Sequence, residues 1–432
     1  MKLSVLAFVG LWIAAQSVAA QTGPAPSLAA VGSPVSLSQA LAAASENFDV
    51  AMARAAVDGA QGDLQAADHA PLPILSFKAG SIDLQHGLGP GNLFADKRID
   101  KAVGLDWTWE RGNKRGLRTA AALAGVKAAQ NDLGEMRVQQ QLMALSAFYD
   151  LLAAQQRQRE IQAIARSAQA MAELMRVRLK AGDVAAQDLA RVEIETIKAR
   201  LDQDSAELER QRTALLLAQL LGQRGPLQVE ESWPALSPLD ASSAAEMNEA
   251  ALDAAIASRP DVQAAQARVD QTMAALDGAL AGRKADLTWG LSVDHFPGTS
   301  TRQVELRVQM PLQLPLQMGY GQQGEIARAR AQAQQAQDMA TKTRLLAATE
   351  LTRLWQEARI AALKASGQQD EVLPRARQVL AQAELAYSKG ALSLTDLLDA
   401  RRTLRSSLLD ALAAQTDFAK AQGSWRLRSA AL

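Results

Sequence analysis

The sequence contains no cysteine. A chain without thiols forms no disulfide, no thiolate zinc site, no cysteine nucleophile and no lipid-modified N-terminal cysteine. Aromatic residues make up only 4% of the 432 residues, and Lys plus Arg equal Asp plus Glu at 46 each. This balance of charge gives no indication of binding to nucleic acid or to an anionic surface. The remaining composition, rich in Ala, Gln, Leu and Arg, is typical of long helices.

Long hydrophobic runs are also scarce. The one marked run extends from Leu3 to Ala15 after Lys2, and small residues at 18–20 precede Gln21. This pattern predicts a secretory signal peptide over residues 1–20. A membrane anchor is the alternative, but the run is shorter than the roughly 20 apolar residues that a span needs. No later segment reads as a transmembrane helix, so we expect the mature chain in the periplasm, outside the cell, or in the outer membrane as a β-barrel.

Recognisable catalytic motifs are missing as well. The sequence has no G-x-S-x-G, P-loop or H-E-x-x-H pattern. His69, His86 and His295 stand apart from one another, without a partner at the spacing of metal ligands. We therefore expect no catalytic, cofactor-binding or metal site, and no enzyme.

The two halves of the chain resemble each other. Gly182 and Gly390 lie 208 residues apart, as do Asp188 and Asp396, and each glycine follows a helical pattern. We predict an internal duplication. Its parts are expected at 21–221 for the first repeat, 222–246 for a proline-containing linker or equatorial segment, and 247–432 for the second repeat.

Each repeat reads as a helix, two strands, a very long helix, a sharp turn and a returning helix. The first helices are expected near 36–69 and 247–284. The long helix of the first repeat runs from Lys114 to Ala181 and returns over 183–221. At 1.5 Å per residue, about 65 residues make a rod of roughly 100 Å, which must pack laterally against other rods.

Apolar residues on the returning arms recur every seven positions, which favours left-handed coiled-coil packing. In the first repeat the stripe consists of Ile194, Leu201, Leu208 and Leu215. In the second repeat Leu373, Leu380 and Tyr387 show the same spacing, and Pro374 is expected to kink this rod.

Four segments break the helical period and predict strands. Apolar and polar residues alternate over 103–110, 287–294 and 303–310, and less regularly over 72–84. Seven of the 17 aromatic residues fall within 72–111 and 285–320, namely Phe77, Phe94, Trp107, Trp109, Trp289, Phe296 and Tyr320. Such strands are typical of outer-membrane barrels, with a half-buried ordinary sheet as the alternative. Because four strands cannot close a barrel, the membrane interpretation requires an oligomer.

With these features the sequence resembles a known family, the TolC-type outer-membrane efflux channels. The resemblance covers nearly all of the mature chain. It depends on the duplicated plan and on the two turns, Gly182-Asp183-Val184 with Asp188-Leu189, and Gly390 with Asp396-Leu397-Leu398-Asp399-Ala400. Two stretches are similar to the heavy-metal, Czc-type branch. These are 109–118, with Asn113 where the branch usually has a second glycine, and 310–326, with Gly321-Gln322-Gln323-Gly324 where it usually has Arg-Asn-Gln-Gly.

The resemblance implies a mainly α fold with a small β part. A homotrimer would form a long coiled-coil α-helical barrel, and each chain would contribute four strands to a twelve-stranded transmembrane β-barrel in the outer membrane. Such a channel passively exports substrate, with a periplasmic adaptor and a proton-driven inner-membrane pump as partners. Heavy-metal cations are the expected cargo. Drug efflux or type I protein secretion through the same architecture, and a poreless periplasmic coiled-coil scaffold, are the alternatives.

Two regions hold the candidate functional residues. The turns at 180–191 and 388–401 are expected to form the gate and the adaptor dock, through Gly182, Asp183, Asp188, Arg191, Gly390, Asp396 and Arg401. There, threefold symmetry would multiply the acidic charge into a field for cations; helix capping is the alternative role for Asp396. At the membrane interface we expect Trp107, Trp109, Lys114, Arg115, Arg118 and Trp289. The three cations oppose the dipole of the helix they begin, so they either meet lipid phosphates or pair with Glu110.

Overall fold

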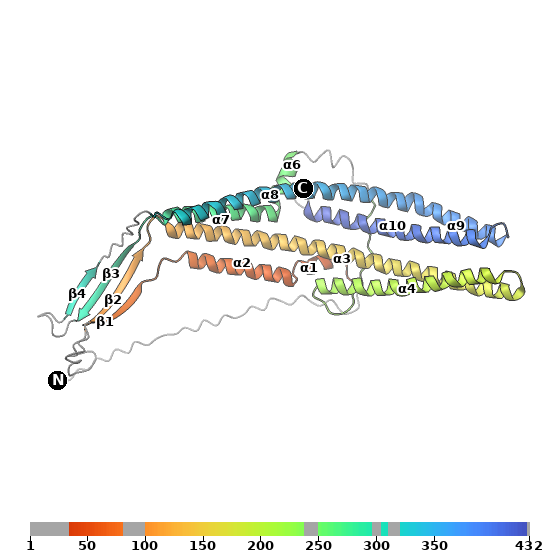
Figure 1. Cartoon of the computed structure of the whole chain (residues 1–432), viewed down its shortest axis with the longest axis horizontal. Helices are drawn as coiled ribbons and strands as arrows, with labels where there is room; N and C mark the ends of the chain where they lie inside the picture. Colours follow the sequence, from red (N-terminus) through yellow and green to blue (C-terminus); the bar gives the residue numbers. More distant parts are fainter. Residues whose placement is uncertain (1–33, 81–99, 237–248, 296–303, 310–319, 430–432) are drawn as a thin grey trace, which may run out of the picture. The chain divides into compact units, whose positions relative to one another are not determined.

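The computed structural model describes residues 34–80, 100–236, 249–295, 304–309 and 320–429. The expected signal peptide, His86, Phe94, Phe296 and the residues 310–319 lie outside these ranges. Within them, helices dominate and a single small sheet is present (Figure 1). No helix of the described residues is long and apolar enough to cross a membrane.

The helices follow the predicted order. They are α1 (Leu37–Ala44), α2 (Phe48–Ala67), α3 (Lys114–Ala181), α4 (Ala186–Leu220), α6 (Glu249–Ser258), α7 (Pro260–Ala281), α8 (Gln323–Ser366), α9 (Leu373–Ser388) and α10 (Leu394–Arg428), with a π-helical turn η1 (Gly367–Val372) between α8 and α9. The 68 residues of α3 have the predicted bounds. The helix expected over 36–69 is instead two, because the Asn47 side chain accepts from the backbone N–H of Val50 and caps a new helix.

A second predicted helix is also broken. The stretch expected as one helix over 247–284 ends at Ser258 and starts again at Pro260, with Arg259 in an extended conformation between them. Proline disfavours the helical conformation of the residue before it and suits the first position of a new helix. Near Pro374 the helical path continues through η1, whose wider turn lies where proline removes a backbone donor.

The four predicted strands form one antiparallel sheet in the order β1 (Ile74–Gly80), β2 (Asp100–Trp109), β3 (Leu287–His295) and β4 (Val304–Gln309). The two predicted repeats meet at the pairing of β2 with β3, where Trp107 lies opposite Trp289 and Leu105 opposite Leu291. Since β1 and β4 end the order, the sheet has two free edges among the residues that the structure describes.

The seven-residue pattern of α4 has two faces. The predicted stripe of Ile194, Leu201, Leu208 and Leu215 is exposed in the chain. A second stripe of the same period is buried, and consists of Val192, Ala199, Ala206 and Thr213. Small residues let helix axes approach closely, so the second stripe is the one on which the intrachain packing rests. In the second repeat, by contrast, Leu373 is buried and Leu380 and Tyr387 pack against buried residues.

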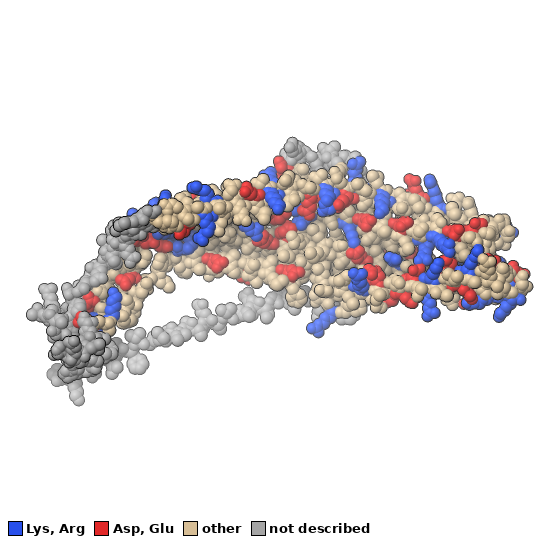
Figure 2. Space-filling model, viewed as in Figure 1, with Lys and Arg blue, Asp and Glu red and all other residues tan. Residues whose placement is uncertain are grey.

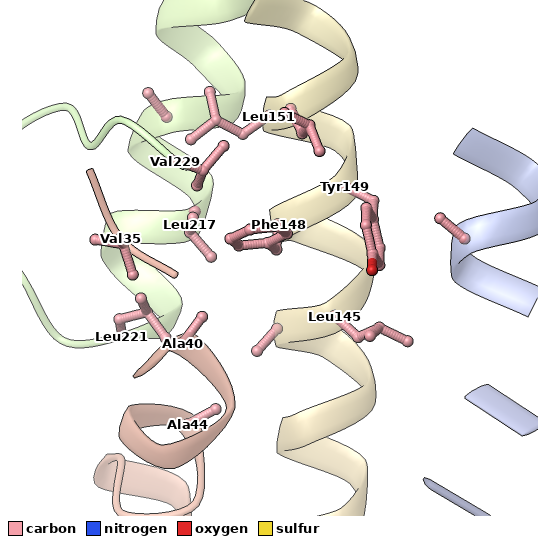
Figure 3. Packing of buried hydrophobic residues seen from close by; sticks show 14 residues of the cluster. Val35, Ala40, Ala44, Leu145, Phe148, Tyr149, Leu151, Leu217, Leu221 and Val229 are labelled. Atoms are coloured by element: carbon pink, nitrogen blue, oxygen red, sulfur yellow. The ribbon is translucent and has the colours of Figure 1, made fainter. Parts of the chain in front are cut away.

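The largest buried cluster joins α1, α3, α4 and the segment after α4. Phe148, Leu151 and Leu217 are fully buried, and Val229 lies against them (Figure 3). Trp233 stacks on the Tyr149 ring with centroids 5.9 Å apart and donates from Nε1 to Gln156 Oε1 at 3.0 Å. The described part of the predicted linker is therefore extended chain packed against α3.

The long helices α3 and α8 both begin after a residue in the left-handed conformation. Asn113 has φ 56° before α3, and Gln322 has φ 60° before α8. Glycine and asparagine tolerate this conformation best. Of the three positions at which the sequence departs from the Czc-type pattern, Asn113 and Gln322 have a positive φ and Gly321 does not. Gln322 donates from Nε2 to the Gly282 carbonyl at 3.2 Å, which ties α8 to the end of α7.

Candidate gate and membrane interface

The two hairpin turns have the same backbone geometry. Gly182 and Gly390 adopt φ values of 81° and 73°. The next N–H in each turn reaches back to a helix carbonyl, from Asp183 to Arg178 and from Ala391 to Ala386, both at 2.9 Å. An added Cβ would meet nothing within 4 Å at either glycine. The positive φ, and not crowding, is therefore what requires glycine here.

The helices that follow these turns begin differently. Ser393 caps α10 by accepting from the Asp396 backbone N–H at 3.2 Å, and its hydroxyl lies 2.7 Å from Asp396 Oδ2. At the equivalent place of α4 the cap residue is Ala185, which makes no side-chain cap, although Asp188 occupies the position of Asp396. Ser393 is therefore the cap of α10 and the Asp396 carboxylate contacts it, whereas Asp188 follows a residue without a capping side chain.

The returning helices of the two repeats contact each other through polar side chains. Arg191 on α4 donates to Thr395 Oγ1 on α10 at 2.9 Å. Further along, Arg402 pairs with Glu195, and Arg405 pairs with Asp202. We call these three contacts the α4–α10 latch. Arg401 does not take part in the latch and pairs with Glu384 of its own hairpin at 3.0 Å.

The α4–α10 latch changes the pKa of Glu195. Partial burial works to raise the pKa of Glu195, but hydrogen bonds and charge from Arg402 and Lys198 outweigh burial and hold that pKa below its ordinary value. Basic and acidic side chains intermix over α4, α9 and α10 (Figure 2). The described residues at the turns therefore form a mixed charged surface and not an acidic patch alone.

A groove of about 290 Å³ lies between α3, α4, α9 and α10. Its apolar lining includes Met171, Val192 and Leu398. Charged side chains of the latch, Glu195 and Arg402, also line it. The groove therefore combines an apolar floor with a charged rim. Among the described residues, no group of three or more His, Cys, Asp or Glu could hold a metal ion.

The sheet turns an apolar face outward. Trp107, Trp109 and Trp289 are 61%, 62% and 48% exposed. Val103, Leu105, Leu291 and Val293 on the same face are also exposed. On the other face Thr108 Oγ1 and Thr288 Oγ1 lie 3.1 Å apart, in hydrogen-bond contact, and Asp294 is buried. An apolar, aromatic outer face with a polar inner face is the arrangement of a strand that meets lipid.

The three predicted interface cations each have a carboxylate partner. Lys114 Nζ lies 2.8 Å from Asp286 and Arg118 lies 2.9 Å from Glu110, both with partly buried members, whereas Arg115 reaches Asp68 at 3.2 Å in an exposed pair. Partial burial works to raise the pKa of Asp286, but hydrogen bonds from Lys114 and the Arg111 backbone outweigh it and lower that pKa. The pairs of Lys114 and Arg118 connect the ends of β3 and β2 to α3, and the pair of Arg115 connects the end of α2 to α3.

Sequence reasoning missed one buried charged cluster. Arg259 is 4% exposed and pairs with Asp261 at 2.8 Å and Glu350 at 2.7 Å, while Arg428 pairs with Glu135 at 2.8 Å and with Glu350 at 3.4 Å. The cluster joins α7, α8, α3 and α10, and so both repeats. The one signal in the sequence was Pro260, which disfavours a helical conformation for Arg259. The carboxylate partners could not be foreseen, because they come from distant segments.

Comparisons with known proteins agree with this geometry. A family model described as "Outer membrane efflux protein" matches residues 38–223. The cobalt-zinc-cadmium resistance protein CzcC of Cupriavidus metallidurans is 25% identical over 86% of this chain and 84% of its own length. Nodulation protein T of Rhizobium leguminosarum bv. trifolii is 25% identical over 87% of this chain and 81% of its own length. Among solved structures, that of CusC, described in terms of folding and transmembrane channel formation, matches with a TM-score of 0.76, 18% identity and 91% coverage of both chains.

Proposed function

We propose that the chain is a member of the outer membrane efflux protein family, whose model matches residues 38–223, and that it is the channel subunit of a tripartite system exporting divalent heavy-metal cations. The chain is an outer-membrane protein with a periplasmic helical extension and is not an enzyme. A passive channel needs no catalytic group, because the energy for export is supplied by an inner-membrane pump, here expected to be proton-driven.

The proposed cargo rests on one observation above the others. Similarity to CzcC, a cobalt-zinc-cadmium resistance protein, extends over 86% of the chain. The stretch 109–118, which is similar to the Czc-type branch, folds into the end of β2 and the start of α3. Its left-handed residue Asn113 occupies the place of a glycine of that branch.

The proposed homotrimer accounts for the surfaces that one chain leaves open. The exposed stripe of α4 and the exposed Met339, Leu346 and Ile360 of α8 are apolar and follow the seven-residue spacing. Within the described residues β1 and β4 have no further strand beside them, and lipid would leave the backbone groups of such edges unsatisfied. Neighbouring copies would cover both kinds of surface, giving a closed barrel of twelve strands above a tunnel of helices.

We further propose that the two hairpin turns form the gate and the adaptor dock. Their members are Gly182, Asp183, Asp188, Arg191, Gly390, Asp396 and Arg401. The α4–α10 latch supports this role, because partly exposed ion pairs between two hairpins can be exchanged for water or for a partner at small free-energy cost. The groove with the charged rim is the surface that fits an adaptor helix.

A second candidate function is supported by the similarity to nodulation protein T. It covers as much of the chain as the similarity to CzcC, at the same identity. Because that relative's name carries no metal, drug efflux or type I protein secretion through the same architecture stays the alternative. The family model that matches residues 38–223 favours a channel over a poreless periplasmic scaffold.

Deletion of the gene tests the cargo. Sensitivity to zinc, cobalt, cadmium, nickel and copper should rise, and the cell should retain more of the exported metal after a pulse. A plasmid copy of the native chain should restore both. If only organic compounds become more toxic, the metal proposal is wrong although the channel remains. Membrane fractionation and light scattering in detergent test the trimer.

A further inference from the structure

We infer that the junction of the sheet with α3 holds a phospholipid headgroup bearing both a phosphate and an ammonium group. A cavity of about 480 Å³ lies at this junction, beside the end of β2. Its lining includes three indole rings, those of Trp107, Trp109 and Trp289, together with Glu110 and Arg115. This volume lies in the range of roughly 300 to 1,000 Å³ typical of small-molecule sites.

Arg115 is the phosphate ligand in this assignment. Of the three cations that begin α3, Lys114 and Arg118 are held in pairs with partly buried members, at 2.8 and 2.9 Å. Arg115 has a longer contact, 3.2 Å to Asp68, in which the side chains are 50% and 59% exposed. An exposed ion pair of this kind contributes little stability, so its guanidinium can exchange the carboxylate for a phosphate and bind it through two N–H groups.

The rest of the lining selects the ammonium group. Indole faces attract a cation through the ring quadrupole, and tryptophan is the strongest of the aromatic residues in this respect. Glu110 adds a negative charge to the same wall, although Arg118 already donates to both of its oxygens. One positive and one negative side chain with three indoles complement a zwitterion better than an anion. A phosphoethanolamine headgroup fits this pattern.

The position of the cavity agrees with such a ligand. It lies at the end of β2, where the outward apolar face stops and the helical part starts. Indole rings are favoured at this depth of a bilayer, between acyl chains and water. The inference rests on the outer-membrane placement in the proposed function, and it adds a specific lipid contact at the leaflet facing the periplasm.

Lipid retention by the purified full-length protein tests the inference. Native mass spectrometry would compare phosphatidylethanolamine with phosphatidylglycerol of the same acyl chains. The first should be retained preferentially, and Arg115→Gln should weaken its binding about tenfold, the loss of one charge-assisted interaction. Asp68→Asn should strengthen binding, because it releases Arg115 from its intrachain partner.

A matched control is available on α8, where Arg359 lies over the Trp355 ring at 5.6 Å, outside the sheet. Arg359→Gln should leave lipid retention unchanged. Equal retention of the two lipids, or unchanged retention in Arg115→Gln, overturns the inference. The headgroup site and the proposed function can fail separately. A channel that exports metals without retaining phosphatidylethanolamine contradicts only the headgroup site. A protein that retains this lipid but does not export metals contradicts only the proposed cargo.

Discussion

The Arg176 guanidinium donates to the Glu193 carboxylate across the first helical hairpin at 3.0 Å. At the equivalent positions of the second hairpin, 208 residues further along, Glu384 accepts from Arg401, also at 3.0 Å. The pair is kept in both repeats and the charges are exchanged. Each hairpin therefore has its own charge pattern at the same distance from its turn, which distinguishes two otherwise similar surfaces.

Reversing one charge of this pair should destabilise the hairpin modestly. Arg176→Glu places two carboxylates together, and we expect a loss of about 0.5 to 1 kcal/mol because both side chains are partly exposed. The double variant Arg176→Glu with Glu193→Arg should recover most of it. Thermal unfolding of the single and double variants measures the coupling. No recovery in the double variant would show that the pair itself contributes nothing.

Removing the α4–α10 latch should open the resting channel. Arg402→Ala combined with Arg405→Ala eliminates the partners of Glu195 and Asp202. Two partly exposed pairs contribute about 0.5 to 1 kcal/mol each, so the ratio of open to closed channels should rise on the order of tenfold. Conductance in planar bilayers measures it.

The control for the latch variant is Arg353→Ala, which removes an arginine that pairs with Glu357 of the same helix, α8, at 2.6 Å. Its conductance should stay at the native level. If the control opens the channel as much as the double variant, a general loss of charge and not the latch is responsible.

Replacing the equivalent aspartates separates capping from ion selectivity. Asp396→Ala should lower stability by less than about 1 kcal/mol, because it removes the carboxylate next to the Ser393 hydroxyl but keeps the backbone N–H that Ser393 caps, and Asp188→Ala should cost less still. If both carboxylates line a cation-selective mouth, each substitution should reduce cation selectivity in bilayers. Measuring reversal potential and melting temperature on the same proteins decides this. Unchanged selectivity in both variants would leave Asp396 as a cap only.

Removing Arg259 should destabilise the junction of the repeats strongly. Its side chain is 4% exposed between Asp261 and Glu350, and breaking a buried ion pair costs about 3 kcal/mol. Arg259→Leu should therefore show a clearly lower melting temperature. Arg344→Leu is the matched control, since Arg344 forms an exposed pair with Asp253 and should change stability by less than about 0.5 kcal/mol. Similar melting temperatures for the two variants would contradict this assignment.

The sequence by itself determined the local elements. The bounds of α3, the turns at Gly182 and Gly390 and the four strands follow from periodicity and from residues with special backbone preferences, which act over a few neighbours. The fold class and the outer-membrane location came from the resemblance to the TolC-type channels and not from periodicity alone. The repeat boundaries and the roles of the gate and interface residues stay predictions. The predictions of one continuous helix over 36–69 and one over 247–284 were wrong. The chain breaks these helices at Asn47 and Arg259, where an N-cap residue and a following proline were visible in the sequence.

The tertiary structure alone decided which faces and charges meet. The apolar stripe of α4 that the sequence made most visible is exposed, and a stripe of smaller residues is buried instead. Arg401 pairs within its hairpin, Arg402 pairs with Glu195 about two hundred residues away, and Arg115 turns toward Asp68. A seven-residue period repeats on more than one side of a helix, so it cannot say which side faces a neighbour. Long side chains reach partners that only the packing of distant helices brings within a few ångströms.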